Sequence, residues 1–219
     1  MLILASNSPR RKQLLTLGGW AFSCAAAPVD ESVLPGEAPE AYVRRLAEAK
    51  ARAALDREPG LPAEALVVAA DTTVVDGEQI LGKPVDPAEA QQMLRQLRDR
   101  RHQVYTGLAV LRAGDGQLHL DAVVTDVWMR DYSDAEMQAY IASGDPLDKA
   151  GAYAIQHAEF NPVARLDGCA ANVVGLPVCR LAQAIEALGG APASPLVQRC
   201  LAEGRQGCAL FNRLAEAGL

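Results

Sequence analysis

The continuous apolar run at Leu66–Ala70 constrains the fold of this chain more than any other feature of its sequence. A strand that is apolar at every position has to be covered on both faces, which is typical of a sheet enclosed by helices. The run stops at Asp71, so we expect a fully buried strand that ends there.

Helix signals alternate with strand signals along the chain. Ser8 and Asp86 each precede a proline, the arrangement of an N-cap followed by the first helical residue. We expect helices over residues 9–17, 39–57, 87–98, 134–143 and 177–188, and strands over 2–5, 20–26, 66–70, 72–75, 79–81, 102–113, 117–130 and 151–156. This alternation, with one long hairpin around Gly114–Gly116, predicts an α/β or α+β domain with a mixed sheet.

The balance of charge disfavours a general affinity for nucleic acid. The 219 residues include 27 acidic and 21 basic side chains, a net charge of −6. Binding to a nucleic-acid backbone depends on neutralising phosphates with Lys and Arg. Half of the residues are apolar, which is enough for a buried core. An anionic ligand therefore has to meet a local cluster of positive charge.

The sequence shows neither a membrane-spanning segment nor the pattern of a signal peptide. No segment has the ~20 consecutive apolar residues that span a bilayer. The apolar N-terminal run precedes its arginines, which is the reverse of the order in a signal peptide. Five cysteines without a CxxC pair are typical of free thiols in a reducing compartment. We expect a cytoplasmic protein that binds neither membranes nor nucleic acid.

The segment Ser6–Lys12 is the first candidate for a functional site. Three consecutive cations, from Arg10 to Lys12, lie in the first turn of the expected helix, where they oppose the helix dipole. A bound phosphate would resolve this conflict, because helix N-termini attract anions and arginine binds phosphate with two parallel hydrogen bonds. The alternative is a solvated first turn with ordinary surface arginines.

Asp71 is the second candidate, because open α/β sheets bind ligands outside the carboxyl ends of their strands. A carboxylate there holds a divalent cation or orients a water; the alternative is a turn in which it bonds the nearby backbone. Glu31, Lys50 and Lys83 extend this set, since Mg²⁺ is typically held by one or two carboxylates together with substrate phosphates. Each of these three alone is more often a solvated surface residue.

Eight short segments carry a more specific signal through their residues and their order. They are Leu4–Arg11, Asp30–Glu31, Ala49–Ala51, Ala69–Val74, Gly82–Pro84, His102–Gly107, Gly144–Gln156 and Asn172–Pro177. Together they resemble the Maf family of nucleoside triphosphate pyrophosphatases over about residues 1–190. The chain departs from the family pattern at His157, at Cys169–Ala171 and at Asp145.

The resemblance implies a housecleaning enzyme that splits a nucleoside triphosphate into the monophosphate and pyrophosphate. It also implies an elongated fold like that of inosine triphosphatases, with two lobes and a central cleft, and a homodimer. The residues at Arg10, Thr72 and Gln156 are similar to those of the branch that acts on dTTP and UTP. Residues 1–190 would form this domain, and residues 191–219 a C-terminal helical tail of unknown role.

We therefore predict one site built from nine residues. Asp71, which the resemblance makes the proton acceptor, acts in catalysis with Lys50 and Lys83. Glu31 and Asp71 hold a divalent cation, either Mg²⁺ or Mn²⁺. The residues that bind substrate are Ser8, Arg10, Arg11, Thr72 and Gln156. The alternative is a non-catalytic nucleotide-binding regulator, since the family resemblance also carries a link to septum formation in dividing cells.

Overall fold

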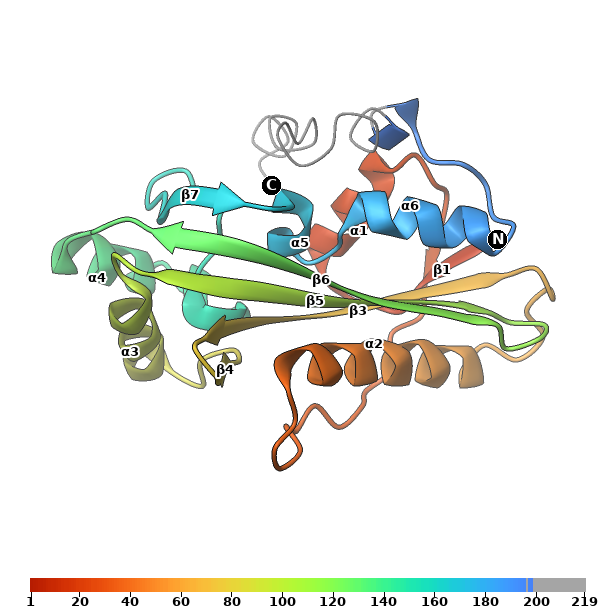
Figure 1. The fold of residues 1–219 in the computed structure, drawn as a ribbon, viewed down its shortest axis with the longest axis horizontal. Helices are drawn as coiled ribbons and strands as arrows, with labels where there is room; N and C mark the ends of the chain where they lie inside the picture. The colour runs from red at the N-terminus through yellow and green to blue at the C-terminus, as the bar shows by residue number, and fades with distance from the viewer. Residues whose placement is uncertain (196, 199–219) are drawn as a thin grey trace.

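A mixed sheet of seven strands forms the centre of the molecule (Figure 1). The computed structural model describes residues 1–195, 197 and 198. The strand order is β2-β1-β3-β5-β6-β7, and β4 pairs with the end of β3. β1 is parallel to β2 and β3, whereas the other pairs are antiparallel. The strands are β1 Leu2–Leu4, β2 Ser23–Cys24, β3 Leu66–Asp76, β4 Gln79–Leu81, β5 Arg101–Arg112, β6 Leu118–Met129 and β7 Val163–Asp167.

Helices cover both faces of this sheet and bury the apolar run of β3, as expected for a fully buried strand (Figure 1). In Figure 1, α2 lies on one face, and α1, α5 and α6 lie on the other. The side chains of β3 alternate accordingly: Leu66 and Val68 pack in the core beneath α1 and α6, whereas Val67 and Ala69 pack against α2. The helices are α1 Pro9–Leu17, α2 Pro39–Asp56, α3 Pro87–Leu97, α4 Asp134–Ala142, α5 Ala170–Val174 and α6 Val178–Ala187.

A second core divides the elongated molecule into two lobes. At one end of the sheet, α3 and α4 pack around Leu94, Tyr132 and Met137, which are fully buried. Two short 3₁₀ helices, η1 at Asp145–Asp148 and η2 at Ala150–Ala152, close this lobe. The long strands β3, β5 and β6 run through both lobes (Figure 1). The predicted fold, a mixed sheet flanked by helices, is confirmed.

The close contact between α2 and β5 depends on one glycine. A Cβ atom at Gly107 would collide with the backbone carbonyl of Val43 in α2. The absence of a side chain therefore lets this helix lie directly on the sheet. The same helix carries Lys50 toward β3, so this packing helps to position a candidate site residue.

Several local expectations are wrong. The strand at Leu66 does not end at Asp71 but continues to Asp76, and the strand expected over 20–26 is limited to Ser23–Cys24. Residues 151–156 form no strand, because Gly151 has a left-handed backbone (φ +66°) and packs against Val74. β7 and α5 were not expected. The helical patterns at 196–202 and 209–217 lie outside the described residues.

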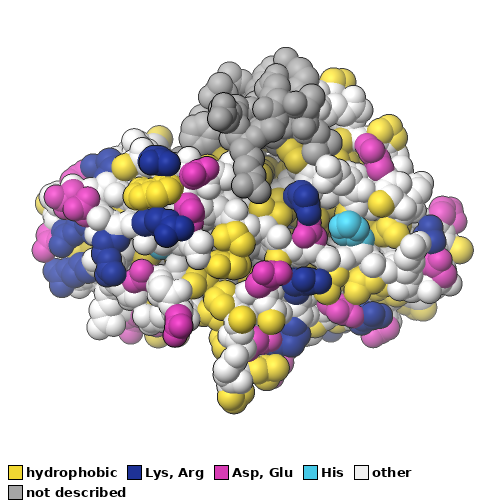
Figure 2. All heavy atoms as spheres, in the orientation of Figure 1, with side chains coloured by type: hydrophobic (Ala, Val, Ile, Leu, Met, Phe, Trp, Pro, Cys, Tyr) yellow, Lys and Arg dark blue, Asp and Glu magenta, His cyan; other side chains and the backbone are white. Residues whose placement is uncertain are grey.

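The basic residues near α3 are neutralised by acidic neighbours. Figure 2 shows Lys and Arg side chains interleaved with Asp and Glu over the lobe that holds α3 and α4. Arg95 and Arg98 pair with Asp134, and Arg101 pairs with Asp126. Within the described part of the chain, none of the helices is long and apolar enough to cross a membrane.

Candidate active site

A cavity of about 650 Å³ lies along β3 between the two lobes. Residues from both lobes line it, from α1 and α2 on one side to η1 and η2 on the other. All nine predicted site residues are among them: Ser8, Arg10, Arg11, Glu31, Lys50, Asp71, Thr72, Lys83 and Gln156. The structure therefore brings together residues that are up to 148 positions apart in the sequence (156 − 8 = 148).

The cavity follows a gap in the edge of β3. β1 pairs with Leu66–Val68, and β4 pairs with Val74–Asp76 on the same edge. Among the described residues, no strand pairs with residues 69–73 on this side, and Asp71 and Thr72 lie in this stretch. Asp71 is therefore beyond the carboxyl end of β1, the parallel neighbour, rather than at the end of its own strand. Since Asp71 is inside a strand, the alternative of a turn residue is wrong.

Lys50 joins the two candidate metal ligands. Its Nζ atom, carried by α2, lies 2.6 Å from Oδ1 of Asp71 and 2.6 Å from Oε1 of Glu31. Asp71 is buried, with 7% of its surface exposed. Burial by itself would raise the pKa of Glu31, but its hydrogen bond to Lys50 and the charges of Lys50, Lys83 and Arg11 lower that pKa overall. The two carboxylates thus converge on one cation.

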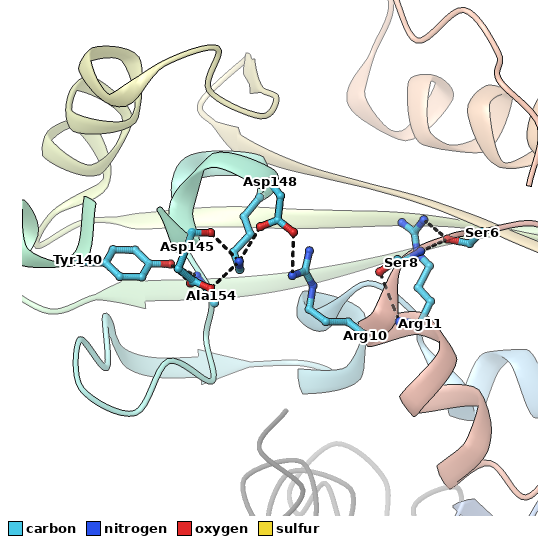
Figure 3. A network of polar contacts seen from close by, with 9 residues as sticks. Ser6, Ser8, Arg10, Arg11, Tyr140, Asp145, Asp148 and Ala154 are labelled. Carbon is cyan, nitrogen blue, oxygen red and sulfur yellow. Dashed lines mark hydrogen bonds and ion pairs between the residues drawn. The ribbon is translucent and has the colours of Figure 1, made fainter. Parts of the chain in front are cut away.

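The N-terminus of α1 forms a second polar wall (Figure 3). Ser8 caps the helix, because its side chain accepts a hydrogen bond from the backbone N–H of Arg11 (3.4 Å). The Arg11 side chain turns inward and donates to the Gly175 carbonyl (2.9 Å), to Ser6 Oγ (3.4 Å) and to Thr72 Oγ1 (3.2 Å). Burial lowers the pKa of Arg11, and the nearby charge of Arg10 lowers it further.

Arg10 instead reaches across the cavity to the other lobe. Its Nη1 atom lies 3.5 Å from Oδ2 of Asp148 in η1 (Figure 3). Asp148 in turn lies 2.6 Å from Nζ of Lys149, a buried lysine that also pairs with Asp145 (2.9 Å). This network joins the two lobes through ion pairs beside the cavity.

The sequence patterns assign no role to three further residues that line the cavity: Tyr42, Lys149 and Tyr153. Tyr153 is held by His102, whose Nε2 atom lies 2.7 Å from the tyrosine hydroxyl. Tyr42 donates from its hydroxyl to the backbone carbonyl of Glu31 (2.9 Å). The two acidic residues just before Lys149, Asp145 and Asp148, were a usable signal, because a lysine is rarely buried unless it is paired.

Comparison with known proteins identifies the family. The family model described as "Maf-like protein" matches residues 1–188. The chain belongs to the Maf family. It is 46% identical over 189 residues to a protein of Geobacter sulfurreducens (86% of this chain, 96% of the relative) and 48% identical over 189 residues to one of Myxococcus xanthus (86% and 93%). A protein of Anaeromyxobacter dehalogenans is 47% identical over 190 residues (86% and 94%). Each of these relatives is named dTTP/UTP pyrophosphatase.

At each of the three departures from the Maf pattern, the residue present here is hydrogen-bonded or packed within the fold. His157 Nδ1 accepts a hydrogen bond from the Phe160 backbone (3.1 Å), and its ring packs edge-on against Tyr140. Ala170 and Ala171 begin α5 and are buried in the core. Asp145 accepts hydrogen bonds from Lys149 and Tyr140. These residues therefore support the local fold at one side of the cavity.

The donor set fits a divalent cation that is shared with a Maf substrate. Among the described residues, no group of three or more His, Cys, Asp or Glu side chains is placed to hold a metal. Glu31 and Asp71 nevertheless bring two carboxylates to one point, where they already bind the Lys50 ammonium. Mg²⁺ needs little more, since it commonly takes one or two carboxylates and completes its oxygen shell with substrate phosphates and water.

Proposed function

We propose that this protein hydrolyses dTTP and UTP to the monophosphate and pyrophosphate in the cytoplasm. The observation that carries the proposal is the cavity in which Lys50 joins Asp71 and Glu31, with Arg10, Arg11 and Lys83 on the same lining. The matches cover nearly the whole length of the relatives, and the names of these relatives support the choice of substrate. Phosphoryl transfer needs mainly positioning and neutralisation of charge, and this set offers both.

The cationic residues bind the triphosphate in this proposal. Arg10, Arg11 and Lys83 neutralise its negative charge, and the hydroxyl of Ser8 with the backbone N–H groups at the start of α1 holds one phosphate. Arg10 has to exchange its exposed contact with Asp148 for the phosphate. That exchange costs little, because a long, partly exposed ion pair contributes at most about 1 kcal/mol.

Asp71 accepts the proton of the attacking water. Its carboxylate is buried beside the cavity and is held in place by Lys50 through a 2.6 Å ion pair. Lys50, itself anchored on α2, keeps Asp71 and Glu31 at fixed positions. Lys83 supplies further positive charge near Glu31, whose pKa it helps to lower.

Glu31 and Asp71 are the residues that would hold Mg²⁺, or Mn²⁺ in its place. A bound divalent cation would neutralise phosphate oxygens and make a water more acidic. Both carboxylates contact the Lys50 ammonium, so a metal ion that they share would take over part of these two ion pairs. Loss of activity on chelation, and its return with Mg²⁺ or Mn²⁺, is the outcome that we expect.

Gln156 reads the base in this proposal. Its amide carries both donors and an acceptor, which match the alternating groups on the edge of uracil and thymine. We expect Gln156→Ala to raise KM for UTP and dTTP more than it changes the rates with CTP, ATP or GTP. A panel of these five triphosphates, measured with Mg²⁺, tests the substrate class. Equal losses with every base would show that Gln156 does not read the base.

The alternative of a non-catalytic regulator gains no support from the cavity. A protein that only binds nucleotides does not need a buried carboxylate paired with lysine next to the phosphate-binding residues. The homodimer stays a prediction, which sedimentation of the purified protein would test.

A further inference from the structure

A chain of hydrogen bonds runs from the cavity into the core through two threonines. Arg11 Nη2 lies 3.2 Å from Thr72 Oγ1, Thr72 Oγ1 lies 2.9 Å from Thr106 Oγ1, and Thr106 Oγ1 lies 2.9 Å from the backbone oxygen of Asn172. The two threonines meet because β3 and β5 place them directly opposite each other. Thr72 lines the cavity, whereas Thr106 is fully buried.

The direction of each hydrogen bond in this chain follows from the available protons. A threonine hydroxyl has one proton, and a carbonyl oxygen has none. Two oxygens at 2.9 Å require a proton between them, so the Thr106 hydroxyl donates its proton to a hydrogen bond with the Asn172 backbone carbonyl. The contact between the threonines then has to use the proton of Thr72, since that of Thr106 is already committed.

The hydroxyl of Thr72 is therefore an acceptor toward anything that binds in the cavity. Its proton points away, into the core, and one of its two lone pairs receives Arg11. The remaining lone pair can accept one hydrogen bond. A phosphate oxygen, which is itself an acceptor, has nothing to offer this group, whereas an N–H donor does.

We propose that Thr106 is a positioning residue that fixes Thr72 as the acceptor for the N3–H group of uracil or thymine. The inference rests on the proposed function, because it names the part of the nucleotide that Thr72 contacts. Cytosine N3 carries no proton, so its lone pair would face the free lone pair of the Thr72 hydroxyl without a hydrogen bond. A donor for a flanking carbonyl group of uracil is present, since the Gln156 amide lines the same cavity.

The test is the preference of Thr106→Val for UTP over CTP. Valine keeps the shape of threonine but cannot accept the proton of Thr72, which becomes free to turn toward the cavity and donate to cytosine. We expect the ratio of kcat/KM for UTP to that for CTP to fall about tenfold, the scale of one hydrogen bond. A ratio equal to that of the wild type, with both substrates slowed alike, would overturn the proposal.

Two further variants separate positioning from general loss of structure. Thr106→Ser keeps the hydroxyl and should restore the wild-type ratio. Thr125→Val is the matched control, because Thr125 is an equally buried threonine of the adjacent strand β6, and its hydroxyl bonds Cys169 and the Asn172 side chain. We expect it to lower thermal stability by a similar amount without changing the ratio. A changed ratio in Thr125→Val would contradict a specific role for Thr106.

Binding of non-hydrolysable analogues distinguishes this inference from the proposed function. The α,β-methylene analogues of UTP and CTP are titrated into the wild type and Thr106→Val by calorimetry. If the wild type hydrolyses neither nucleotide but prefers the UTP analogue, and Thr106→Val loses that preference, the proposed function fails and the inference stands. If the wild type hydrolyses UTP and Thr106→Val keeps its preference, the inference alone fails. A wild type without preference for either analogue also overturns it.

Discussion

At the scale of single residues, the proposed chemistry depends on the carboxylate of Asp71. Asp71→Asn keeps the size of the side chain and can still contact Lys50, but the amide cannot take a proton from water. We expect kcat to fall by at least ~100-fold, the lower range of general-base contributions, while the variant still folds normally. Steady-state hydrolysis of UTP and circular dichroism measure the two effects. Turnover close to that of the wild type would show that Asp71 is not the proton acceptor.

The buried His102 gives a second residue-scale prediction, on stability. Burial lowers its pKa from 6.5 to about 4. Between these two values the unfolded chain binds a proton that the folded protein does not, so stability falls as the pH falls through this range. From this residue, the free energy of unfolding at pH 5 should be about 2 kcal/mol lower than at pH 7.5.

Chemical denaturation of the wild type and His102→Gln at both pH values measures this contribution. Glutamine can still bond the Tyr153 hydroxyl but does not titrate, so the variant should lose less stability between pH 7.5 and pH 5. The same loss in both proteins would show that His102 is not the group responsible.

At the scale of elements, the loop that carries Glu31 is held by one arginine of α2. Arg45 binds both carboxylate oxygens of Glu37 (2.6 and 2.7 Å) and donates to the Ser32 carbonyl (2.9 Å). Arg45→Met removes these contacts and should lower kcat/KM for UTP about tenfold, because a small displacement of a site residue is enough to slow catalysis.

The neighbouring Arg44 provides the control for this loop. It forms an exposed ion pair with Glu40 one turn away on the same helix (3.4 Å), a type that contributes little. Arg44→Met should therefore leave kcat/KM unchanged. Equal effects of the two variants would mean that the loop is not positioned by Arg45.

Elements with local signals were predicted well, and those set by distant contacts were not. Ser8 and Asp86 cap α1 and α3 as expected, because a cap is formed within four residues of sequence. The interior polar pair at Asp71 and Thr72 suggested a strand end, whereas the strand continues past a gap between β1 and β4. Only the pairing of the whole sheet reveals that gap.

At the scale of the whole molecule, the candidate site combines residues that no local pattern connects. Arg11 and Gly175, which share a hydrogen bond, are 164 positions apart. The family resemblance supplied this grouping, since motifs kept in one order mark residues that meet in the fold. It did not supply the burial of Lys149 or the pairing of Thr72 with Thr106, which depend on the packing of η1 and on the register of β3 and β5.

The central claim is that this cavity splits a nucleoside triphosphate between its α- and β-phosphates. The most direct measurement is the separation of products after incubation of the purified protein with UTP and Mg²⁺, with Asp71→Asn as the inactive control. We predict equal amounts of UMP and pyrophosphate, and no orthophosphate. Release of orthophosphate, or tight binding of UTP without hydrolysis, would contradict the claim.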